Sequence, residues 1–168
     1  MSKNKNILIL NTGGTFNKNY DEIKGELIVP NNNLAVESIL KHSKITDCTV
    51  DGLIYKDSLE INKFDRHLLK EYINMSDYEK IIIIHGTDTM DKTAKFLSKH
   101  IKNKTIILTG SMIPYTINPI ESTANLLLAL GFISTNNKNN IFISMHGYVK
   151  KYNKILKNRN LGVFECQK

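Results

Sequence analysis

Hydroxyl groups, a carboxylate and a lysine recur in this chain in a pattern that could hydrolyse an amide or an ester. They belong to Thr12, Thr15, Ser58, Thr87, Asp88, Ser111 and Lys157. A threonine hydroxyl is a poor nucleophile unless a base or a proton relay takes its proton. A lysine in its neutral form can accept that proton, and an aspartate can orient the lysine. Backbone N–H groups at glycine turns could stabilise the oxyanion that forms.

Secondary structure must bring these groups together. Ile81 to Ile84 are four consecutive β-branched residues without alternation, which is typical of a strand covered on both faces of a parallel sheet. After Gly86, either Thr87 or Asp88 is placed to cap a helix over Lys92 to Ile101. Ligands bind at the carboxyl ends of strands in open α/β sheets, so this is a candidate site. An ordinary capping pair explains the same two residues equally well.

A second candidate turn follows the first predicted strand, Asn6 to Asn11. Its sequence is TGGT over residues 12–15, and two glycines let the backbone turn sharply and approach a ligand closely. The turn is neither a phosphate loop nor a dinucleotide fingerprint, because the required Gly-Lys-Ser/Thr and third glycine are absent. Phe16 to Lys24 is polar and predicts a loop. A plain Gly-Gly turn is the alternative, but a threonine on each side at a strand end favours function.

The remaining elements predict an α/β fold. The predicted extended elements are a hairpin or extended segment over Gly25–Val29 and strands over Thr49–Tyr55, Thr105–Leu108 and Ile141–Met145. The predicted helices are one over Leu34–Ser43, one with Leu68, Leu69, Tyr72 and Ile73 on its apolar side, and one that starts between Pro119 and Glu121. His146–Asn160 is basic and predicted to be irregular. About five strands alternate with four helices, so we expect a mainly parallel sheet with helices on both faces, in three layers.

Composition limits the class of protein. The chain has 168 residues, 41% hydrophobic and 23% charged, with a net charge of +7, which fits one globular domain. The lysines are scattered, so we do not predict a nucleic-acid partner. The two cysteines form no CxxC motif, and no metal or cofactor motif is present. No apolar run reaches the roughly 20 residues of a membrane span. We therefore expect a soluble, cytoplasmic protein without metal or cofactor.

Four motifs together resemble a known family. TGGT at 12–15, DS at 57–58, HGTDTM at 85–90 and TGSMIP at 109–114 occur in the order and spacing of the bacterial-type L-asparaginase/glutaminase family. The resemblance covers nearly the whole chain, and HGTDTM with an upstream TGGT is highly specific. It implies a flavodoxin-like, doubly wound N-terminal domain. It also implies hydrolysis of asparagine to aspartate and ammonia through an acyl-threonine intermediate, without a cofactor.

The resemblance also assigns roles to individual residues. It implies that Thr15 is the primary nucleophile, and that Thr87, Asp88 and Lys157 form a second triad. Ser58 matches a serine that binds the substrate's α-carboxylate, and Asp88 matches the acceptor of its α-ammonium group. Tyr20 matches a catalytic tyrosine of a mobile loop, although Leu27 competes for that position. Asp57, Gly14, Gly86 and Ser111 complete the predicted substrate-binding set.

Departures from the family pattern keep three hypotheses open. The family adds a C-terminal domain, whereas residues 1–168 are predicted to be a single N-terminal-like domain without it. Leu59 stands where many members have a polar residue, and Glu121 stands near a position that is commonly Asp. The chain could be an amidohydrolase acting on a small amide, a weak or inactive module that binds a small amino acid, or a half-enzyme that needs a partner chain. The apolar helix over Ala124–Phe132 suggests either a homodimer face or core packing.

Overall fold

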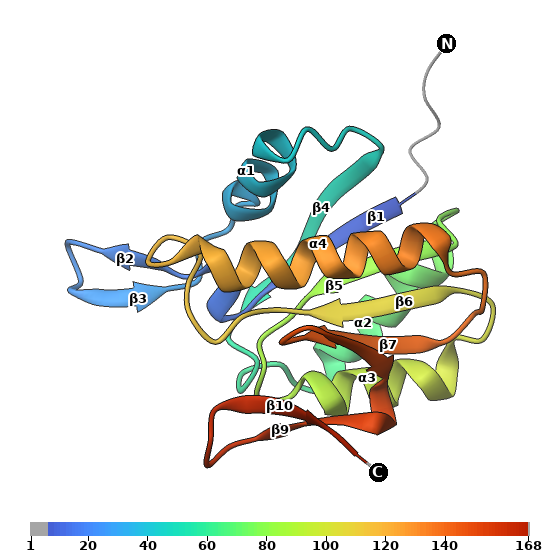
Figure 1. Ribbon diagram of the computed structural model, residues 1–168. Coiled ribbons are helices and arrows are strands. Elements are labelled where there is room, and N and C mark those ends of the chain that lie inside the picture. The colour runs from blue at the N-terminus through green and yellow to red at the C-terminus, as the bar shows by residue number, and fades with distance from the viewer. Residues whose placement is uncertain (1–6, 168) are drawn as a thin grey trace.

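A six-stranded sheet lies at the centre of the computed structural model, which describes residues 7–167 (Figure 1). The strand order is β4-β1-β5-β6-β7-β8. The strands are β1 (Ile7–Gly13), β4 (Cys48–Lys56), β5 (Lys80–Ile84), β6 (Thr105–Thr109), β7 (Ile141–Met145) and β8 (Tyr148–Lys151). The first five are parallel and β8 pairs antiparallel with β7. The predicted mainly parallel sheet is confirmed.

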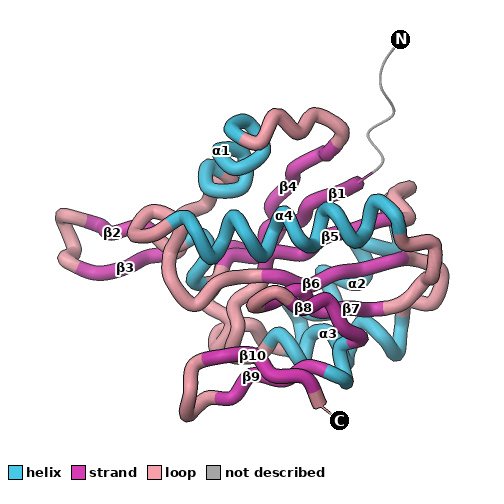
Figure 2. Tube along the Cα trace, in the orientation of Figure 1, coloured by secondary structure: helices cyan, strands magenta, loops and turns pink. Residues whose placement is uncertain are grey.

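Helices cover both faces of this sheet (Figure 2). Helices α1 (Leu34–His42) and α4 (Pro119–Thr135) pack on one face. Helices α2 (Lys63–Met75) and α3 (Met90–His100) pack on the other face. The three-layer, doubly wound α/β architecture is therefore confirmed, and β1 and β5 lie where the chain changes direction across the sheet.

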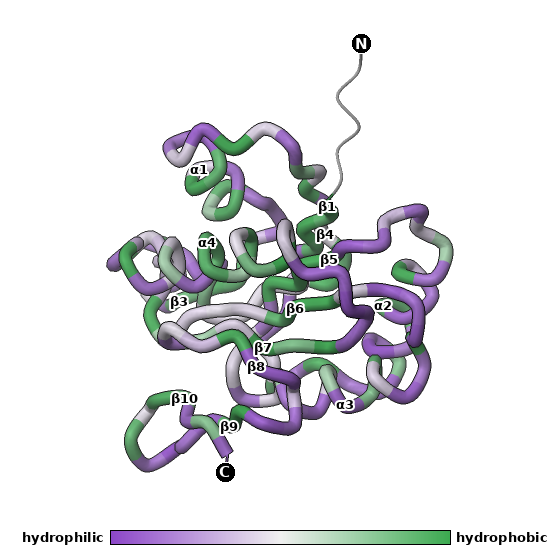
Figure 3. The backbone as a smooth tube through the Cα atoms, turned by 45° about the vertical axis from the view of Figure 1, so that its right-hand side comes forward, coloured by the Kyte–Doolittle hydropathy of each residue, from purple (hydrophilic) through white to green (hydrophobic). Residues whose placement is uncertain are grey.

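The run Ile81–Ile84 shows why the sheet needs two covering layers. Ile81 and Ile83 join the core under α2 and α3, whereas Ile82 and Ile84 join the core under α1 and α4. All four side chains are fully buried. Alternate residues of a strand point to opposite faces, so an unbroken apolar run is stable only between two layers. Figure 3 shows this pattern as hydrophobic strands at the centre of the molecule.

Two predicted helix starts have different outcomes. Helix α4 begins at Pro119, and the Asn118 side chain accepts a hydrogen bond from Ile120 N at 3.0 Å, which confirms the predicted start. The predicted capping of α3 by Thr87 or Asp88 is wrong, because α3 begins at Met90 and Thr89 occupies the capping position. Thr87 and Asp88 are therefore not used to cap this helix.

The predicted hairpin or extended segment over Gly25–Val29 is confirmed, because it contains the strand Glu26–Ile28, whereas four other short strands were not expected. The predicted loop 16–24 contains β2 (Asn19–Asp21), which pairs with β3 (Glu26–Ile28). The predicted irregular segment 146–160 is also wrong, because it contains β8 and β9 (Ile155–Asn158), and β9 pairs with β10 (Val163–Cys166). These strands have three or four residues each, too short for a clear alternation of polar and apolar residues.

Two residues at positive φ form the turn between β7 and β8. His146 has φ 51° and Gly147 has φ 84°, and Met145 pairs directly with Tyr148. Two central residues with positive φ match the type I′ turn that joins antiparallel strands. This turn makes the sixth strand antiparallel and redirects the chain toward β9 and β10 (Figure 1).

Helix α4 packs into the core through one face. Leu126, Ala129, Leu130 and Ile133 are buried in the cluster that also holds Ile82 and Ile107. Core packing accounts for this face, and a homodimer contact through α4 stays a prediction. Across residues 7–167, no helix has both the length and the apolar character to cross a membrane.

Candidate active site

Two glycine turns meet where β1 and β5 end. A Cβ atom at Gly14 would lie 2.4 Å from Gly86 Cα, and Gly14 has a φ of +76°. Neither the space nor the conformation admits a side chain at Gly14. This close approach places Thr15 and Thr87, each one residue further along the chain, on neighbouring turns at the carboxyl edge of the sheet.

The two threonines of TGGT have different environments. Thr12 is fully buried, and its Oγ1 donates to Ile84 O at 2.7 Å. Thr12 therefore joins β1 to β5. Thr15 is half-buried and begins a short 3₁₀ helix, Thr15–Asn17. Of the two hydroxyls, only that of Thr15 belongs to a partly exposed residue, which is what a nucleophile needs.

Lys157 joins Thr87 and Asp88 in one cluster. Its Nζ donates to Thr87 Oγ1 at 2.9 Å and to Asp88 Oδ1 at 2.7 Å. The side chain of Lys157 is 12% exposed and that of Asp88 is 36% exposed. Thr87 Oγ1 also contacts Met112 Sδ at 3.4 Å, a weak acceptor. The predicted set of hydroxyl, lysine and carboxylate is therefore within hydrogen-bonding distance.

A second network holds the hairpin that carries Lys157. Phe164 pairs with Lys157 across β9 and β10, and Phe164 N donates to His146 Nδ1 at 3.1 Å. Since Nδ1 accepts, His146 Nε2 carries the proton, and it lies 2.9 Å from Glu121 Oε1. Glu121 also accepts from Met112 N at 2.9 Å. The strand opposite Lys157 is thus tied to the loop that contacts Thr87.

Asp57 and Ser58 approach the glycine turns from the end of β4. A Cβ atom at Gly86 would lie 2.7 Å from Ser58 Oγ, so the hydroxyl is next to that turn although Ser58 is only 1% exposed. Asp57 pairs with Lys18 at 2.6 Å. Partial burial raises the pKa of Asp57. Hydrogen bonds from Lys18 and the Leu59 amide, together with the charges of Lys18 and Lys157, lower it by more than burial raises it. The pKa of Asp57 is therefore below its ordinary value.

Other predicted binding groups already have partners within the protein. Ser111 Oγ donates to Ile113 O at 2.6 Å, and Gly14 N donates to Lys56 O at 2.8 Å. These two groups shape the turns through their bonds within the protein. Their predicted contacts with a substrate remain predictions, and the Gly14 amide would have to exchange its partner to serve an oxyanion.

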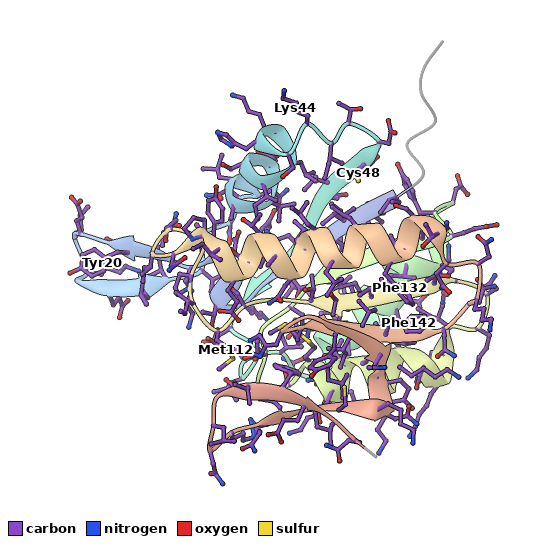
Figure 4. The ribbon with its side chains drawn as sticks, viewed as in Figure 1. Tyr20, Lys44, Cys48, Met112, Phe132 and Phe142 are labelled. Atoms are coloured by element: carbon purple, nitrogen blue, oxygen red, sulfur yellow. The ribbon has the colours of Figure 1, made fainter. Side chains whose placement is uncertain are left out.

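Tyr20 lies apart from the cluster. It is on the β2–β3 hairpin and 62% exposed. Figure 4 shows Tyr20 on this hairpin, well separated from Met112, which contacts Thr87. Within the part of the chain that the structure describes, no hydrogen bond joins Tyr20 to Thr15, Thr87 or Lys157. The structure therefore does not bring this predicted catalytic residue to the others.

A buried histidine, His85, forms a hydrogen bond with the turn that follows β5. His85 is fully buried, and its Nδ1 lies 2.8 Å from Gly86 O. A carbonyl can only accept, so Nδ1 carries the proton, and Nε2 accepts from Thr93 Oγ1 at 2.8 Å. Burial lowers the pKa of His85 from 6.5 to about 4. His85 is therefore neutral at physiological pH and orients the Gly86 peptide.

Three further residues, which the sequence pattern did not predict, contact residues of the site. These are Lys18, Met112 and Arg159, which contact Asp57, Thr87 and Asp88 respectively. The spacing of Arg159 offered a signal, because residues i and i+2 of an extended chain share a face and Lys157 lies two positions earlier. The contacts of Lys18 and Met112 join separate loops and leave no such local pattern.

The fold and this cluster define an α/β protein with a threonine–lysine–aspartate site at the carboxyl edge of its sheet. Among residues 7–167, no group of three or more histidine, cysteine, aspartate or glutamate side chains is arranged to hold a metal ion. The cluster itself offers a hydroxyl, an amine and a carboxylate.

Comparison with known proteins identifies the family. The model of the family described as "Asparaginase, N-terminal" matches residues 6–164, and the chain therefore belongs to the asparaginase family. L-asparaginase 1 of Escherichia coli K12 is 32% identical over 136 residues, which are 75% of this chain and 39% of that protein.

Solved structures agree with this assignment. The thermostable L-asparaginase from Thermococcus kodakarensis is 27% identical with a TM-score of 0.79, over 95% of this chain and 50% of that chain. A probable cytoplasmic L-asparaginase from Campylobacter jejuni shares the fold, with a TM-score of 0.77 and 22% identity, over 95% of this chain and 52% of that one. The chain thus spans about half the length of these solved relatives, and less of the curated one.

Proposed function

We propose that this domain hydrolyses the side-chain amide of L-asparagine, or of a related small amide, to the corresponding acid and ammonia. The observation that carries the proposal is the position of Lys157 Nζ, which lies 2.9 Å from Thr87 Oγ1 and 2.7 Å from Asp88 Oδ1. A hydroxyl, an amine and a carboxylate in hydrogen-bonding contact can move a proton during acyl transfer. Membership of the asparaginase family supports the choice of an amide.

In the proposed reaction Thr15 Oγ attacks the amide carbonyl carbon. The C–O bond forms, the C–N bond breaks, and ammonia leaves after it receives a proton. Water then cleaves the acyl-Thr15 ester and releases the acid. The Thr87–Lys157 pair takes and returns protons at Thr87 Oγ1 in both steps, and Asp88 orients the amine. Ser58 and Asp57, beside the Gly86 turn, are proposed to hold the polar groups of the substrate.

Ammonia release tests this proposal directly. The purified chain is assayed with L-asparagine, L-glutamine and simple amides, alongside a Thr15→Ala variant. We expect Thr15→Ala to lower kcat by about a thousandfold or more, as loss of a nucleophile does in other hydrolases. The matched control is Thr135→Ala, because Thr135 is exposed at the end of α4 and, among residues 7–167, its hydroxyl bonds only to carbonyls of its own helix. Wild-type release no higher than that of Thr15→Ala would refute the proposal.

A ligand-binding module without turnover is the second candidate. The exposed position of Tyr20, away from the Lys157 cluster, favours it. Under this alternative, L-aspartate raises the melting temperature of the protein by mass action, while no ammonia is released from asparagine. Thermal shift and the ammonia assay on the same preparation distinguish the two functions.

A further inference from the structure

Arg159 places a second cation on Asp88. It follows β9, and its Nη2 donates to Asp88 O at 2.8 Å while Nη1 lies 3.3 Å from Asp88 Oδ1. Lys157 Nζ lies 2.7 Å from the same carboxylate oxygen. One carboxylate therefore faces two cations, and its attraction for a third cation is weakened.

The other charges near the site do not restore a negative field. Asp57 is paired with Lys18 at 2.6 Å. The carboxylate of Glu121 accepts hydrogen bonds from the backbone amides of Met112 and Ile113 and from His146 Nε2. Its oxygens therefore point into the loop that contains Met112. The carboxylates of Asp57, Asp88 and Glu121 thus all have donors of the protein as partners.

Arg159 also has unused binding capacity. A guanidinium carries five N–H donors in a planar fork that matches a carboxylate, and two of its nitrogens contact Asp88. The Arg159 side chain is 58% exposed. A substrate carboxylate can reach the remaining donors, whereas a substrate ammonium group at Asp88 would stand beside both Arg159 and Lys157.

We propose that Arg159 makes this site select amides that carry a carboxylate but no ammonium group. The substrate class is the monoamides of short dicarboxylic acids, of which succinamic acid is the simplest, in preference to zwitterionic asparagine. This inference rests on the proposed amidohydrolase function and names its substrate class. Succinamic acid and asparagine have the same amide and carboxylate and differ only in the α-ammonium group, so comparing them isolates its effect.

The kinetic test compares kcat/KM for these two substrates. We expect wild type to prefer succinamic acid by about threefold to tenfold, the range of one or two exposed charge interactions. Arg159→Gln should abolish this preference, and Arg159→Lys, which keeps the charge, should retain most of it. The matched control is Lys41→Gln, which removes one exposed positive charge from α1, on the side of the molecule away from β9 and β10 (Figure 1). It should leave the preference unchanged.

A binding test separates this inference from the proposed function. Succinate and L-aspartate are titrated calorimetrically into Thr15→Ala, with and without Arg159→Gln. We expect succinate to bind more tightly than aspartate, and Arg159→Gln to remove the difference. Preference for the zwitterion in either test, equal affinities, binding of neither ligand, or a preference insensitive to Arg159→Gln would overturn the inference. No ammonia from any amide would overturn the proposed function alone, since the titration still measures charge preference.

Discussion

Lys157 Nζ lies 2.7 Å from Asp88 Oδ1 although 69 residues separate them in the chain. The contact forms because β9 and β10 fold back beneath the carboxyl edge of the sheet, where the turn after β5 presents Thr87 and Asp88 (Figure 1). The same amine contacts Thr87 Oγ1. This relationship gives the proposed site its proton relay.

Removing the amine at position 157 should strongly lower activity with little effect on folding. In Lys157→Met we expect kcat for ammonia release to fall about a hundredfold or more, the scale of general acid–base catalysis. Asp88 is one-third exposed, so water partly replaces the lost partner and the free energy of unfolding should change by no more than about 1 kcal/mol. Ammonia assay and urea unfolding measure the two effects, and an active Lys157→Met would contradict the relay.

The contact between the two glycine turns should be intolerant of side chains. Gly14→Ala places Cβ 2.4 Å from Gly86 Cα at a φ of +76°, and Gly86→Ala places Cβ 2.6 Å from Ser58 Cβ. We expect each to lower the free energy of unfolding by about 3 kcal/mol or to prevent folding.

Gly131→Ala is the matched control for these glycine variants. Its added Cβ meets nothing within 4 Å, and Gly131 lies within α4, where alanine is the better helix former. We expect it to raise the free energy of unfolding by about 0.5–1 kcal/mol. Equal stabilities for Gly14→Ala and Gly131→Ala would show that the close approach of the turns is not rigid.

His85 should make stability depend on pH below neutrality. Burial lowers its pKa from 6.5 to about 4 in the folded protein, so the unfolded chain binds a proton first as the pH falls. Neutral His85 makes its full contribution to the free energy of unfolding above pH 6.5, and this contribution decreases as the pH falls to about 4. When the pH falls from 7.5 to 5, we expect His85 to lower the free energy of unfolding by about 2 kcal/mol.

Urea unfolding of wild type, His85→Gln and His42→Gln at both pH values tests this expectation. His42 is exposed on α1, so His42→Gln should keep the wild-type difference between pH 7.5 and pH 5. His85→Gln should be less stable at pH 7.5 and should show a smaller difference. If His85→Gln folds too poorly to measure, the NMR titration of the His85 ring in wild type decides, and a pKa near 6.5 would contradict the prediction.

His146 should control activity through the position of Lys157. Its Nδ1 accepts from Phe164 N at 3.1 Å, and Phe164 is the residue paired with Lys157. In His146→Ala we expect kcat to fall about tenfold to a hundredfold, because small displacements of a catalytic group are costly. In His146→Ala/Lys157→Met the further loss should be small, since both changes act on one group.

A structural role for His146 without effect on Lys157 predicts a different result. In that case His146→Ala would be less stable than wild type. The activity lost in His146→Ala and the activity lost in Lys157→Met would then add in the double variant. His42→Gln again serves as the control for losing one histidine. Full activity of His146→Ala would show that the hairpin keeps its position without this hydrogen bond.

The positions of the central strands and of the four helices follow from local sequence. Ile81–Ile84 predicts a strand covered on both faces, and the structure buries its alternate side chains in two different clusters. The glycine turns after β1 and β5 were also expected where they occur. Such features are encoded by residues a few positions apart, so a pattern of β-branched residues, glycines and helix-starting residues is enough to find them.

The sequence alone did not locate the strands after β7 or the partners of the site residues. β8, β9 and β10 have four residues each, and their pairing depends on a two-residue turn and on burial of Ile155 and Phe164 in the core. Tyr20 lies away from the cluster, and Arg159 lies on Asp88. The residue types and strand ends that could do chemistry are therefore determined by sequence. Which of them meet is decided by contacts between distant segments, which have no local periodicity to reveal them.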